Sequence, residues 1–407
     1  MKCRFCKNPL EHSFIDLGFA PPSNSYLTRE DLSRPEIYYP LRVKVCDQCW
    51  LVQTEDFASK HEFFNDNYAY FSSTSKSWCE HAKNYVNMIV PRLGLSEKSL
   101  VIEIASNDGY LLEHFGPLAI PCLGIEPTQS TALEAEKKGI EVVKEFFTVE
   151  LSTDLVDKYG QADLIIGNNV FAHVPDILDF SIAMKNTLKS DGVITLEFPH
   201  LLELIKNNQF DTIYHEHYSY LSLLAVTKIL AAAKLKIYDV EQVSTHGGSL
   251  RIYCAHEGSN KDISPAVSKL LKEEKDQGLD KVVTYLAFQK EAEKIKSALL
   301  TFLISLKNEA KKVAAYGAAA KGNTLLNYAG IKPDLLPLVF DAAIAKQGKY
   351  MPGSHIPILS PDRLNNLDLD YLIILPWNII DEVMKQNAHL LSKGTKFVTV
   401  IPKLNIL

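Results

Sequence analysis

The chain has 407 residues, of which 46% are hydrophobic and 23% are charged. This composition is typical of a globular protein with about two to three domains, and it excludes a disordered or fibrous protein. The formal net charge is -6, whereas nucleic-acid binders use an excess of positive charge to neutralise phosphates. We therefore expect no nucleic-acid partner.

The sequence also indicates the cellular compartment of the protein. It lacks an uncharged apolar stretch of about 18 residues, and its start, Met1-Lys2-Cys3, differs from the basic and then apolar pattern of a signal peptide. Seven cysteines are too few for a disulfide scaffold in a chain of this length. We therefore expect a cytoplasmic protein with no membrane partner.

Two cysteine pairs lie in the first 50 residues, at Cys3 and Cys6 and at Cys46 and Cys49. Each CxxC pair can form a knuckle around one tetrahedral Zn2+, and four thiolates leave no open position on the metal. The pairs therefore predict one structural zinc ion that helps to fold a small domain at 1–80. The alternatives are four unconnected cysteines, or a zinc ribbon that binds nucleic acid, which the lack of a dense Arg/Lys face argues against.

The central region, 81–262, alternates short β-rich runs with amphipathic connections, which predicts a doubly wound α/β sheet. Two later runs follow one another without a long helix and predict an antiparallel pair at one edge. Together these runs predict a seven-stranded Rossmann-like domain; they begin at Val101, Cys122, Val142, Ala162, Val193, Lys236 and Ser249.

The last part of the chain is expected to contain a connecting helix at 263–311 and a smaller Rossmann-like α/β domain at 312–407. The helix is indicated by an apolar stripe with alternating spacings of four and three, suited to a connecting or oligomerising helix. The stripe is Phe288, Ala292, Ile295, Leu299, Phe302 and Leu306. The final domain begins with a strand, a tight turn and a helix from Val313.

Acidic side chains mark the first two strand ends of the central domain. After Glu103 the chain makes a turn of small residues, where a backbone can approach a nucleoside closely, and a helix is expected to begin near Tyr110. Glu126 ends the next strand, where a carboxylate can accept from both ribose hydroxyls. A carboxylate beside the turn repels a pyrophosphate, so the pair favours S-adenosylmethionine (SAM) over NAD, although either acid alone could be a capping or surface residue.

Histidines gather after the fourth strand. His173 is expected at the carboxyl edge of the sheet, where open α/β sheets bind ligands. In the run at 214–220, YHEHYSY, a neutral histidine next to a carboxylate is suited to general-base catalysis. A metal site, for which the spacing differs from HExxH, and a structural hydrogen-bond cluster are the alternatives. On an extended segment His215 and His217 would share a face, so either could be the base.

Seven motifs together carry a family resemblance: the double CxxC, VIEIASNDGYLL, GIEPT, NNVFAHVPD, YHEHYSYLS, THGGSLR and YGAAAKGNTLLNY. They resemble the SAM-dependent sugar C-methyltransferases of bacterial deoxysugar pathways over nearly the whole chain. The resemblance implies a zinc-binding, a SAM-binding and a C-terminal domain, the last of which binds a sugar nucleotide. It also implies methylation of a nucleotide-linked 4-keto-6-deoxy sugar, with dTDP expected as the nucleotide, at C3 and without a catalytic metal.

The resemblance assigns roles to individual residues. His217 is the base, Glu216 and Tyr214 assist it, and His173 and Tyr68 lie around the sugar. Ala105 stands where the family commonly has a glycine. The expected cofactor-binding residues lie at and after the first strand ends: Glu103, Ala105, Asn107, Asp108, Gly109, Glu126, Pro127, Phe147, Asn168 and Asn169.

Two sites are candidates for the substrate phosphates. At 315–323, backbone amides, the start of a helix and Lys321 come together, with Asn323 beside them, which suits an anion. An ordinary turn with an exposed lysine is the alternative. The second candidate is Gly247-Gly248-Ser249 with Arg251.

Other functions remain open at this point. Methylation at C5 of the same sugar class, methyl transfer to oxygen or nitrogen, and a zinc-ribbon interaction protein with a degenerate methyltransferase fold are the alternatives. Carbon needs a base and donors for the enolate oxygen before it can accept a methyl group, and the histidine run supplies both, so C-methylation is the preferred hypothesis. We expect a monomer, with a homodimer as the alternative.

Overall fold

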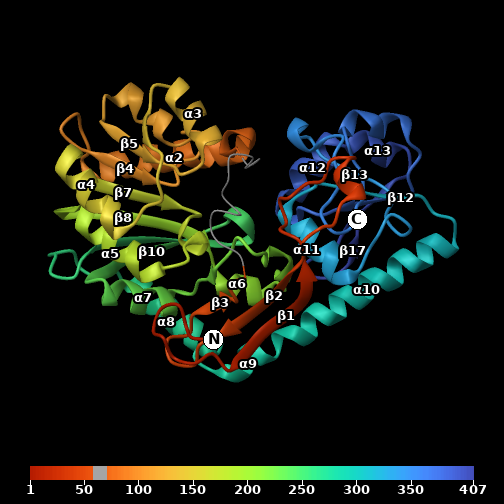
Figure 1. Ribbon diagram of the computed structural model, residues 1–407, viewed down its shortest axis with the longest axis horizontal. Coiled ribbons are helices and arrows are strands. Elements are labelled where there is room, and N and C mark those ends of the chain that lie inside the picture. The colour runs from red at the N-terminus through yellow and green to blue at the C-terminus, as the bar shows by residue number, and fades with distance from the viewer. Residues whose placement is uncertain (58–70) are drawn as a thin grey trace.

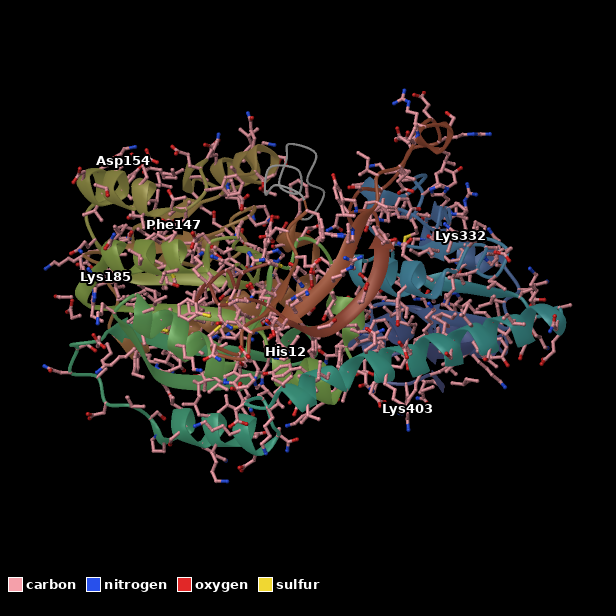
Figure 2. The ribbon with its side chains drawn as sticks, turned by 60° about the horizontal axis from the view of Figure 1, so that its bottom comes forward. His12, Phe147, Asp154, Lys185, Lys332 and Lys403 are labelled. Carbon is pink, nitrogen blue, oxygen red and sulfur yellow. The ribbon has the colours of Figure 1, made fainter. Side chains whose placement is uncertain are left out.

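The computed structural model describes residues 1–57 and 71–407. It contains a four-stranded, a seven-stranded and a six-stranded sheet. Figure 1 shows the seven-stranded sheet in one lobe, the C-terminal sheet in another, and strands β1 and β2 between them at the base. In Figure 2 His12 of β1 lies between Lys185 of the first lobe and Lys332 of the second. Among the described residues, no helix is both long enough and apolar enough to span a bilayer.

The N-terminal sheet is antiparallel and has the order β1-β2-β3-β9. Its first three strands are β1 (His12–Ala20), β2 (Tyr39–Val45) and β3 (Val52–Thr54). The fourth, β9 (Ser219–Tyr220), comes from the middle of the chain, directly after the histidine run. A strand of the central region thus completes the sheet of the segment that carries the cysteine pairs.

The central sheet has the order β10-β11-β8-β7-β4-β5-β6. Strands β4 to β8 are parallel, and β11 runs antiparallel to both β8 and β10, so the predicted antiparallel edge is confirmed. The strands are β4 (Val101–Ile104), β5 (Cys122–Ile125), β6 (Glu141–Val143), β7 (Ala162–Asn168), β8 (Leu188–Pro199), β10 (Leu235–Val243) and β11 (Ser249–His256). The chain order reverses at β4, and open sheets bind ligands at such a switch point.

The helices of this region are α2 (Lys76–Leu93), α3 (Gln129–Lys137), α4 (Val149–Tyr159), α5 (Ile177–Thr187), α6 (Leu201–Lys206) and α7 (Leu223–Ala232). The helix expected near Tyr110 is wrong. Instead two 3-10 turns, Leu112–His114 and Gly116–Leu118, connect β4 to β5. Pro117 accounts for this, because it lacks an N–H to donate and disfavours helical geometry at Gly116.

The segment expected as one connecting helix contains three: α8 (Pro265–Asp276), α9 (Val282–Leu286) and α10 (Phe288–Asn308). Gly278, with a φ of 81°, follows the end of α8. The apolar stripe of α10 is buried as predicted, except that Leu303 takes the place of the half-buried Phe302. Phe288 stacks on Phe14 of β1, with ring centroids 4.6 Å apart, so α10 packs against the N-terminal sheet.

The C-terminal sheet has the order β14-β13-β12-β15-β16-β17 and is parallel except for β17. Its strands are β12 (Val313–Tyr316), β13 (Val339–Phe340), β14 (Ile358–Leu359), β15 (Tyr371–Ile374), β16 (Lys396–Thr399) and β17 (Asn405–Ile406). Its helices are α11 (Ala320–Ala329), α12 (Ile380–Gln386) and α13 (Ala388–Ser392). The predicted fold class is confirmed. The boundaries expected at 80, 262 and 311 stay a prediction.

Candidate functional site

The four cysteines of the two CxxC pairs converge. Their sulfur atoms all lie within 4.8 Å of one another, with Cys3 and Cys49 at 3.6 Å and Cys6 and Cys46 at 3.4 Å. A tetrahedral zinc site with Zn–S bonds of about 2.3 Å places its sulfurs about 3.8 Å apart. In both knuckles the residue after the second cysteine has a positive φ. The donor set and its spacing therefore fit one structural Zn2+.

The turn after β4 provides a polar cradle at the switch point of the sheet. Glu126, at the end of β5, accepts hydrogen bonds from the backbone amides of Asn107 at 3.0 Å and Thr128 at 2.8 Å. Gly109 has a φ of 73°, and a Cβ there would lie 2.4 Å from Ile140 Cδ1, so this position requires glycine. Ala105 also has a positive φ, of 57°.

Several side-chain atoms in this cradle are buried without a hydrogen-bond partner in the described structure. They are Glu103 Oε2, Ser106 Oγ, Asp108 Oδ1, both polar atoms of the Asn168 amide, and Asn169 Oδ1. Burial raises the pKa of Glu103, and the nearby Asp108 and Glu126 add to this effect. The aminoacyl and sulfonium part of SAM carries a cationic donor for the oxygen atoms and a carboxylate acceptor for Asn168 Nδ2, so the residues fit the cofactor.

Three further residues expected at the site are Phe147, Pro127 and Tyr68. Phe147 is buried in the core of the central domain, with its ring centroid 5.4 Å from that of Phe180, and its role in cofactor binding stays a prediction. Pro127 is half-buried and lies next to Glu126. Tyr68 lies outside the described residues.

His217 has a defined hydrogen-bond geometry. Its Nδ1 lies 2.9 Å from the carbonyl oxygen of Thr212, and only a protonated Nδ1 can donate there. The lone pair of the neutral ring is therefore on Nε2. Its ring centroid lies 4.0 Å from that of Tyr214 and 4.7 Å from that of His173. Burial, together with the nearby His173, lowers the pKa of His217, so the ring is neutral at pH 7.

His215 lies apart from this group. The segment turns, with the amide of His217 donating to the carbonyl of Tyr214 at 3.0 Å, so it is not extended and the two histidines do not share a face. The His215 Nε2 lies 3.2 Å from the carbonyl oxygen of Pro40, and its ring contacts Tyr39. His215 therefore contacts β2, whereas His217 contacts His173.

The carboxylate of Glu216 is buried and contacts a residue far away in sequence. Asn24 Nδ2 lies 2.8 Å from Glu216 Oε1 and 3.0 Å from Oε2. Burial raises the pKa of Glu216 to about 7, and the hydrogen bond from Asn24 lowers it. The backbone carbonyl of Glu216 lies 2.9 Å from Nδ1 of His173. Asn24, which sequence reasoning missed, thus favours the ionised form of the acid beside His217.

The first turn of α11 packs against the residue that directly precedes the histidine run. The Thr324 hydroxyl donates to the carbonyl of Ile213 at 2.7 Å. Lys321 Nζ donates to Asn378 Oδ1 at 2.6 Å and lies 4.6 Å from the centroid of the Trp377 ring. Trp377 Nε1 in turn donates to Asp211 at 2.7 Å. A cation from helix α11 is thereby placed near His217.

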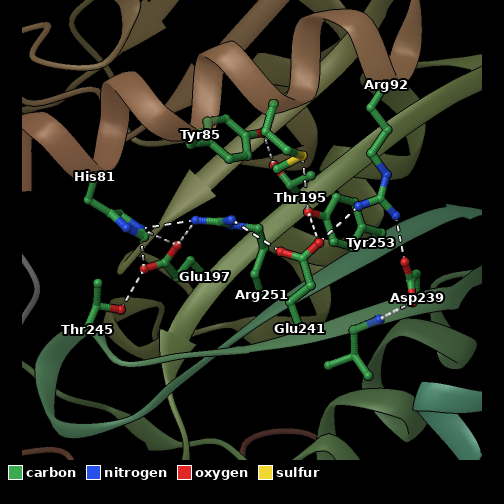
Figure 3. A network of polar contacts seen from close by, with 12 residues as sticks. His81, Tyr85, Arg92, Thr195, Glu197, Asp239, Glu241, Thr245, Arg251 and Tyr253 are labelled. Atoms are coloured by element: carbon green, nitrogen blue, oxygen red, sulfur yellow. Dashed lines mark hydrogen bonds and ion pairs between the residues drawn. The ribbon is translucent and has the colours of Figure 1, made fainter.

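The remaining phosphate candidates have internal partners. Arg251 is buried and pairs with Glu197 at 2.7 Å and Glu241 at 3.4 Å, as Figure 3 shows. The Ser249 hydroxyl is buried and donates to the carbonyl of Thr245. Because the charge of Arg251 is already paired with these acids, the structure does not favour a phosphate contact here, and the expected contact stays a prediction. The amide of Asn323 is likewise buried and donates to the carbonyl of Ser23 at 2.6 Å.

Sequence reasoning also missed His81, Trp377 and His246. The His81 Nε2 lies 2.9 Å from both oxygens of Glu197, and its ring stacks on Trp78. His246 could have been found, since it stands inside the THGGSLR motif. Nothing in the sequence around Asn24 or Trp377 indicates a contact with the histidine run, because each comes from a distant segment.

Comparisons with known proteins agree with this geometry. Family models match residues 3–64 as a zinc binding domain, 78–240 as a methyltransferase domain and 244–402 as a C-methyltransferase C-terminal domain. The C-methyltransferase NovU of Streptomyces niveus is 33% identical over 406 residues, which cover 100% of this chain and 96% of the relative.

Solved structures resemble the chain more remotely. A SAM-dependent methyltransferase from Clostridium acetobutylicum is 15% identical and covers 44% of this chain and 92% of its own, with a TM-score of 0.36. Magnesium protoporphyrin IX methyltransferase from Synechocystis, with bound S-adenosylhomocysteine (SAH), is 15% identical and covers 44% and 83%, with a TM-score of 0.35. Both are too remote to indicate a ligand of this chain.

The relative spans the whole chain and the three family models follow one another along it. The enzyme uses SAM and contains a structural zinc site. The chain belongs to the family of SAM-dependent C-methyltransferases that have an N-terminal zinc-binding domain and a dedicated C-terminal domain.

Proposed function

We propose that this enzyme methylates C3 of a nucleotide-linked 4-keto-6-deoxy sugar, with dTDP as the nucleotide, in the biosynthesis of a branched deoxysugar. The observation that carries the proposal is His217, a neutral histidine whose Nδ1 hydrogen bond to Thr212 leaves Nε2 as a proton acceptor. A carbon next to a ketone becomes nucleophilic only after such a proton is removed.

His217 removes the C3 proton in this proposal. The Tyr214 ring lies directly against the base, and we assign its hydroxyl to the sugar. The His173 ring packs against that of His217 in a T-shaped contact, and Glu216 is the neighbouring acid, with a pKa of about 7. Bound SAM supplies a methyl group that its sulfonium charge makes electrophilic. The chain has only to hold the sugar with C3 directed at that group.

We assign cofactor binding to the cradle at β4, β5 and β7. Glu126 accepts from the ribose hydroxyls, which its two backbone contacts support by fixing the carboxylate plane. Glu103 and Asp108 accept from the amino group. Asn168 and Asn169, at the end of β7, contact the aminoacyl part. The unpartnered atoms of these side chains support the assignment.

The nucleotide part of the substrate is assigned to the C-terminal domain. Lys321 and the first amides of α11 form the phosphate site, with Asn323 next to them. A helix N-terminus with a lysine attracts an anion, and the contact of Thr324 with Ile213 connects this turn to the histidine run. We propose a monomeric, cytoplasmic enzyme, since zinc thiolates need reduced cysteines.

Proton exchange without methyl transfer tests the mechanism. The full-length enzyme is incubated in D2O with SAH and a dTDP-linked 4-keto-6-deoxy sugar, and NMR follows deuterium at C3 and C5. We expect exchange at C3 that His217→Asn slows by about 10²- to 10⁴-fold and that His215→Asn leaves nearly unchanged. Exchange at C5 alone would indicate that C5, and not C3, is the methylated carbon. Absence of exchange in the wild type would contradict the enolate route.

A separate measurement identifies the atom of the substrate that receives the methyl group. With 13C-labelled SAM, carbon–carbon coupling in the product identifies a C-methyl group. A product whose labelled methyl carbon is attached to oxygen or nitrogen would contradict the proposal.

A further inference from the structure

His246 stands out in the loop that joins β10 to β11. Neither of its ring nitrogens has a hydrogen-bond partner among the described residues, and its Nδ1 is buried. Its φ is 54°, in the left-handed region that few residues other than glycine adopt. A buried polar atom without a partner destabilises the folded protein, and backbone strain of this kind persists where the surroundings impose it.

The surroundings hold this loop from three sides. Thr245 donates to Glu197 at 2.9 Å, a contact visible in Figure 3. The carbonyl of Gly247 accepts from Gln209 at 2.8 Å. The His246 ring itself meets the ring of Trp78 in a T-shaped contact, with centroids 4.8 Å apart. The loop is therefore fixed in a strained conformation that presents a histidine.

Trp377 connects this histidine to the base. A Cβ on Gly247 would lie 2.3 Å from the Trp377 ring, so the two are in close contact. The same indole donates to Asp211, which directly precedes Thr212, the acceptor of His217 Nδ1. Lys321 lies over the face of the indole. Trp377 thus contacts Lys321, the residue after His246, and the residue before the hydrogen-bond acceptor of His217.

Burial keeps His246 neutral at pH 7. Burial lowers the pKa of His246 to about 4, and the positive charge of Lys321 lowers it as well. A neutral imidazole can donate an N–H to an oxygen that gains negative charge, without giving up the proton. His217, in contrast, uses its N–H on a backbone carbonyl and offers only a lone pair. The two histidines are therefore suited to opposite tasks.

We propose that His246 is a catalytic residue that donates a hydrogen bond to the C4 ketone oxygen of the substrate while His217 removes the neighbouring proton. The inference rests on the proposed function. The C3–H bond breaks, its proton goes to Nε2 of His217, its electron pair forms the C3–C4 double bond, and the carbonyl electrons move to oxygen. His246 keeps its own proton throughout.

Deuterium exchange with SAH and the dTDP-linked 4-keto sugar measures this step directly. We expect His246→Ala to slow exchange at C3 by about 10²-fold or more, the usual effect of removing one oxyanion donor. The amide nitrogen of Asn lies near the position of Nδ1 and that of Gln near Nε2. One of His246→Asn and His246→Gln should therefore restore part of the rate. His389→Ala, at an exposed histidine, is the matched control.

A second readout separates a donor from a structural role. The infrared carbonyl band of the sugar, labelled with 13C at C4 and bound to His217→Asn with SAH, should lie at lower frequency than in solution. It should return toward the solution value when His246→Ala is added. SAH affinity should stay within about threefold of wild type.

Each result bears on the inference. Wild-type exchange rates in His246→Ala, or a bound carbonyl band at its solution frequency in the presence of His246, would overturn it even if the other variants fail to fold. Failure of the wild type to exchange at all would instead overturn the proposed function, and this inference with it.

Discussion

Asn24 contacts both carboxylate oxygens of Glu216, at 2.8 and 3.0 Å, although 192 positions separate the two residues in sequence. The segment that follows β1 therefore reaches the acid beside the proposed base. This contact stabilises the ionised form of a carboxyl group that burial makes hard to ionise.

Removing this contact should shift the pH dependence of the reaction. Because the hydrogen bond from Asn24 lowers the pKa of Glu216, Asn24→Ala should raise it above its value of about 7. We expect the limb of the kcat/KM profile near pH 7 to move to higher pH. Asn207→Ala, which removes a similar contact with the partly exposed Glu203, is the control and should leave the profile in place. An unshifted limb in Asn24→Ala would mean that Glu216 does not control it.

Loss of the zinc site should affect both stability and activity. Cys46→Ser should lower zinc content from one per chain toward zero and decrease the free energy of unfolding by about 4 kcal/mol or more. Methylation should fall as well, because Thr54 in β3 donates to the carbonyl of His217 at 3.1 Å. Elemental analysis, denaturation and activity assays measure these effects. Cys79→Ser, outside the cluster, should retain its zinc, and full activity in zinc-free protein would contradict the coupling.

Glu126 should contribute strongly to SAM binding. A charged acceptor for both ribose hydroxyls is worth about 1.5–3 kcal/mol, so Glu126→Ala should weaken SAM by about 10- to 150-fold in calorimetry. Glu141→Ala, at an exposed acid in β6, should bind SAM normally. Equal dissociation constants for Glu126→Ala and wild type would mean that the ribose binds elsewhere.

Ala105→Gly should stabilise the fold. The left-handed conformation costs a residue with a Cβ about 1–2 kcal/mol, and the added flexibility of glycine offsets about 1 kcal/mol of the gain. Denaturation should therefore give an unfolding free energy equal to or up to about 1 kcal/mol above wild type. The same change at the exposed Ala231 in α7 should destabilise the protein. A loss of stability in Ala105→Gly would mean that the methyl group packs favourably there.

His173 should make the protein less stable at acidic pH. Burial lowers the pKa of His173 from 6.5 to about 4. Between these two pH values the histidine is therefore protonated in the unfolded chain but neutral in the folded one. Its contribution is full above pH 6.5 and is lost as the pH falls to about 4, with a slope of up to about 1.4 kcal/mol per pH unit. Glu216 acts oppositely between about pH 4.5 and 7, because burial raises its pKa. In urea titrations at pH 5 and 7, His173→Asn should reduce the loss at pH 5. If wild type and His173→Asn lose the same stability between pH 7 and pH 5, another group takes up the proton on unfolding.

The local parts of this fold could be predicted from the sequence. The strand ends that carry Glu103 and Glu126, and the knuckles of Cys3 and Cys46, depend on spacing within short segments. The helix expected at Tyr110 failed because Pro117 outweighed the usual order of a strand followed by a helix.

Contacts between distant segments could not be predicted in this way. The choice between His215 and His217 depends on a turn and on Pro40 of β2, which approaches from the N-terminal sheet. Arg251 was expected to meet a phosphate because its charge is visible in the sequence. The partner that neutralises it, Glu197, lies on another strand.

The membership of Ser219–Tyr220 in the N-terminal sheet also limits how this protein can be recombined. A chimaera that exchanges only the zinc-binding segment with that of a relative would place a foreign β3 against a native β9, two residues after His217. The side chains that meet across that pair, and the position of the histidine run, would then be mismatched. A functional exchange has to include the strand that lies more than 150 residues further along the chain.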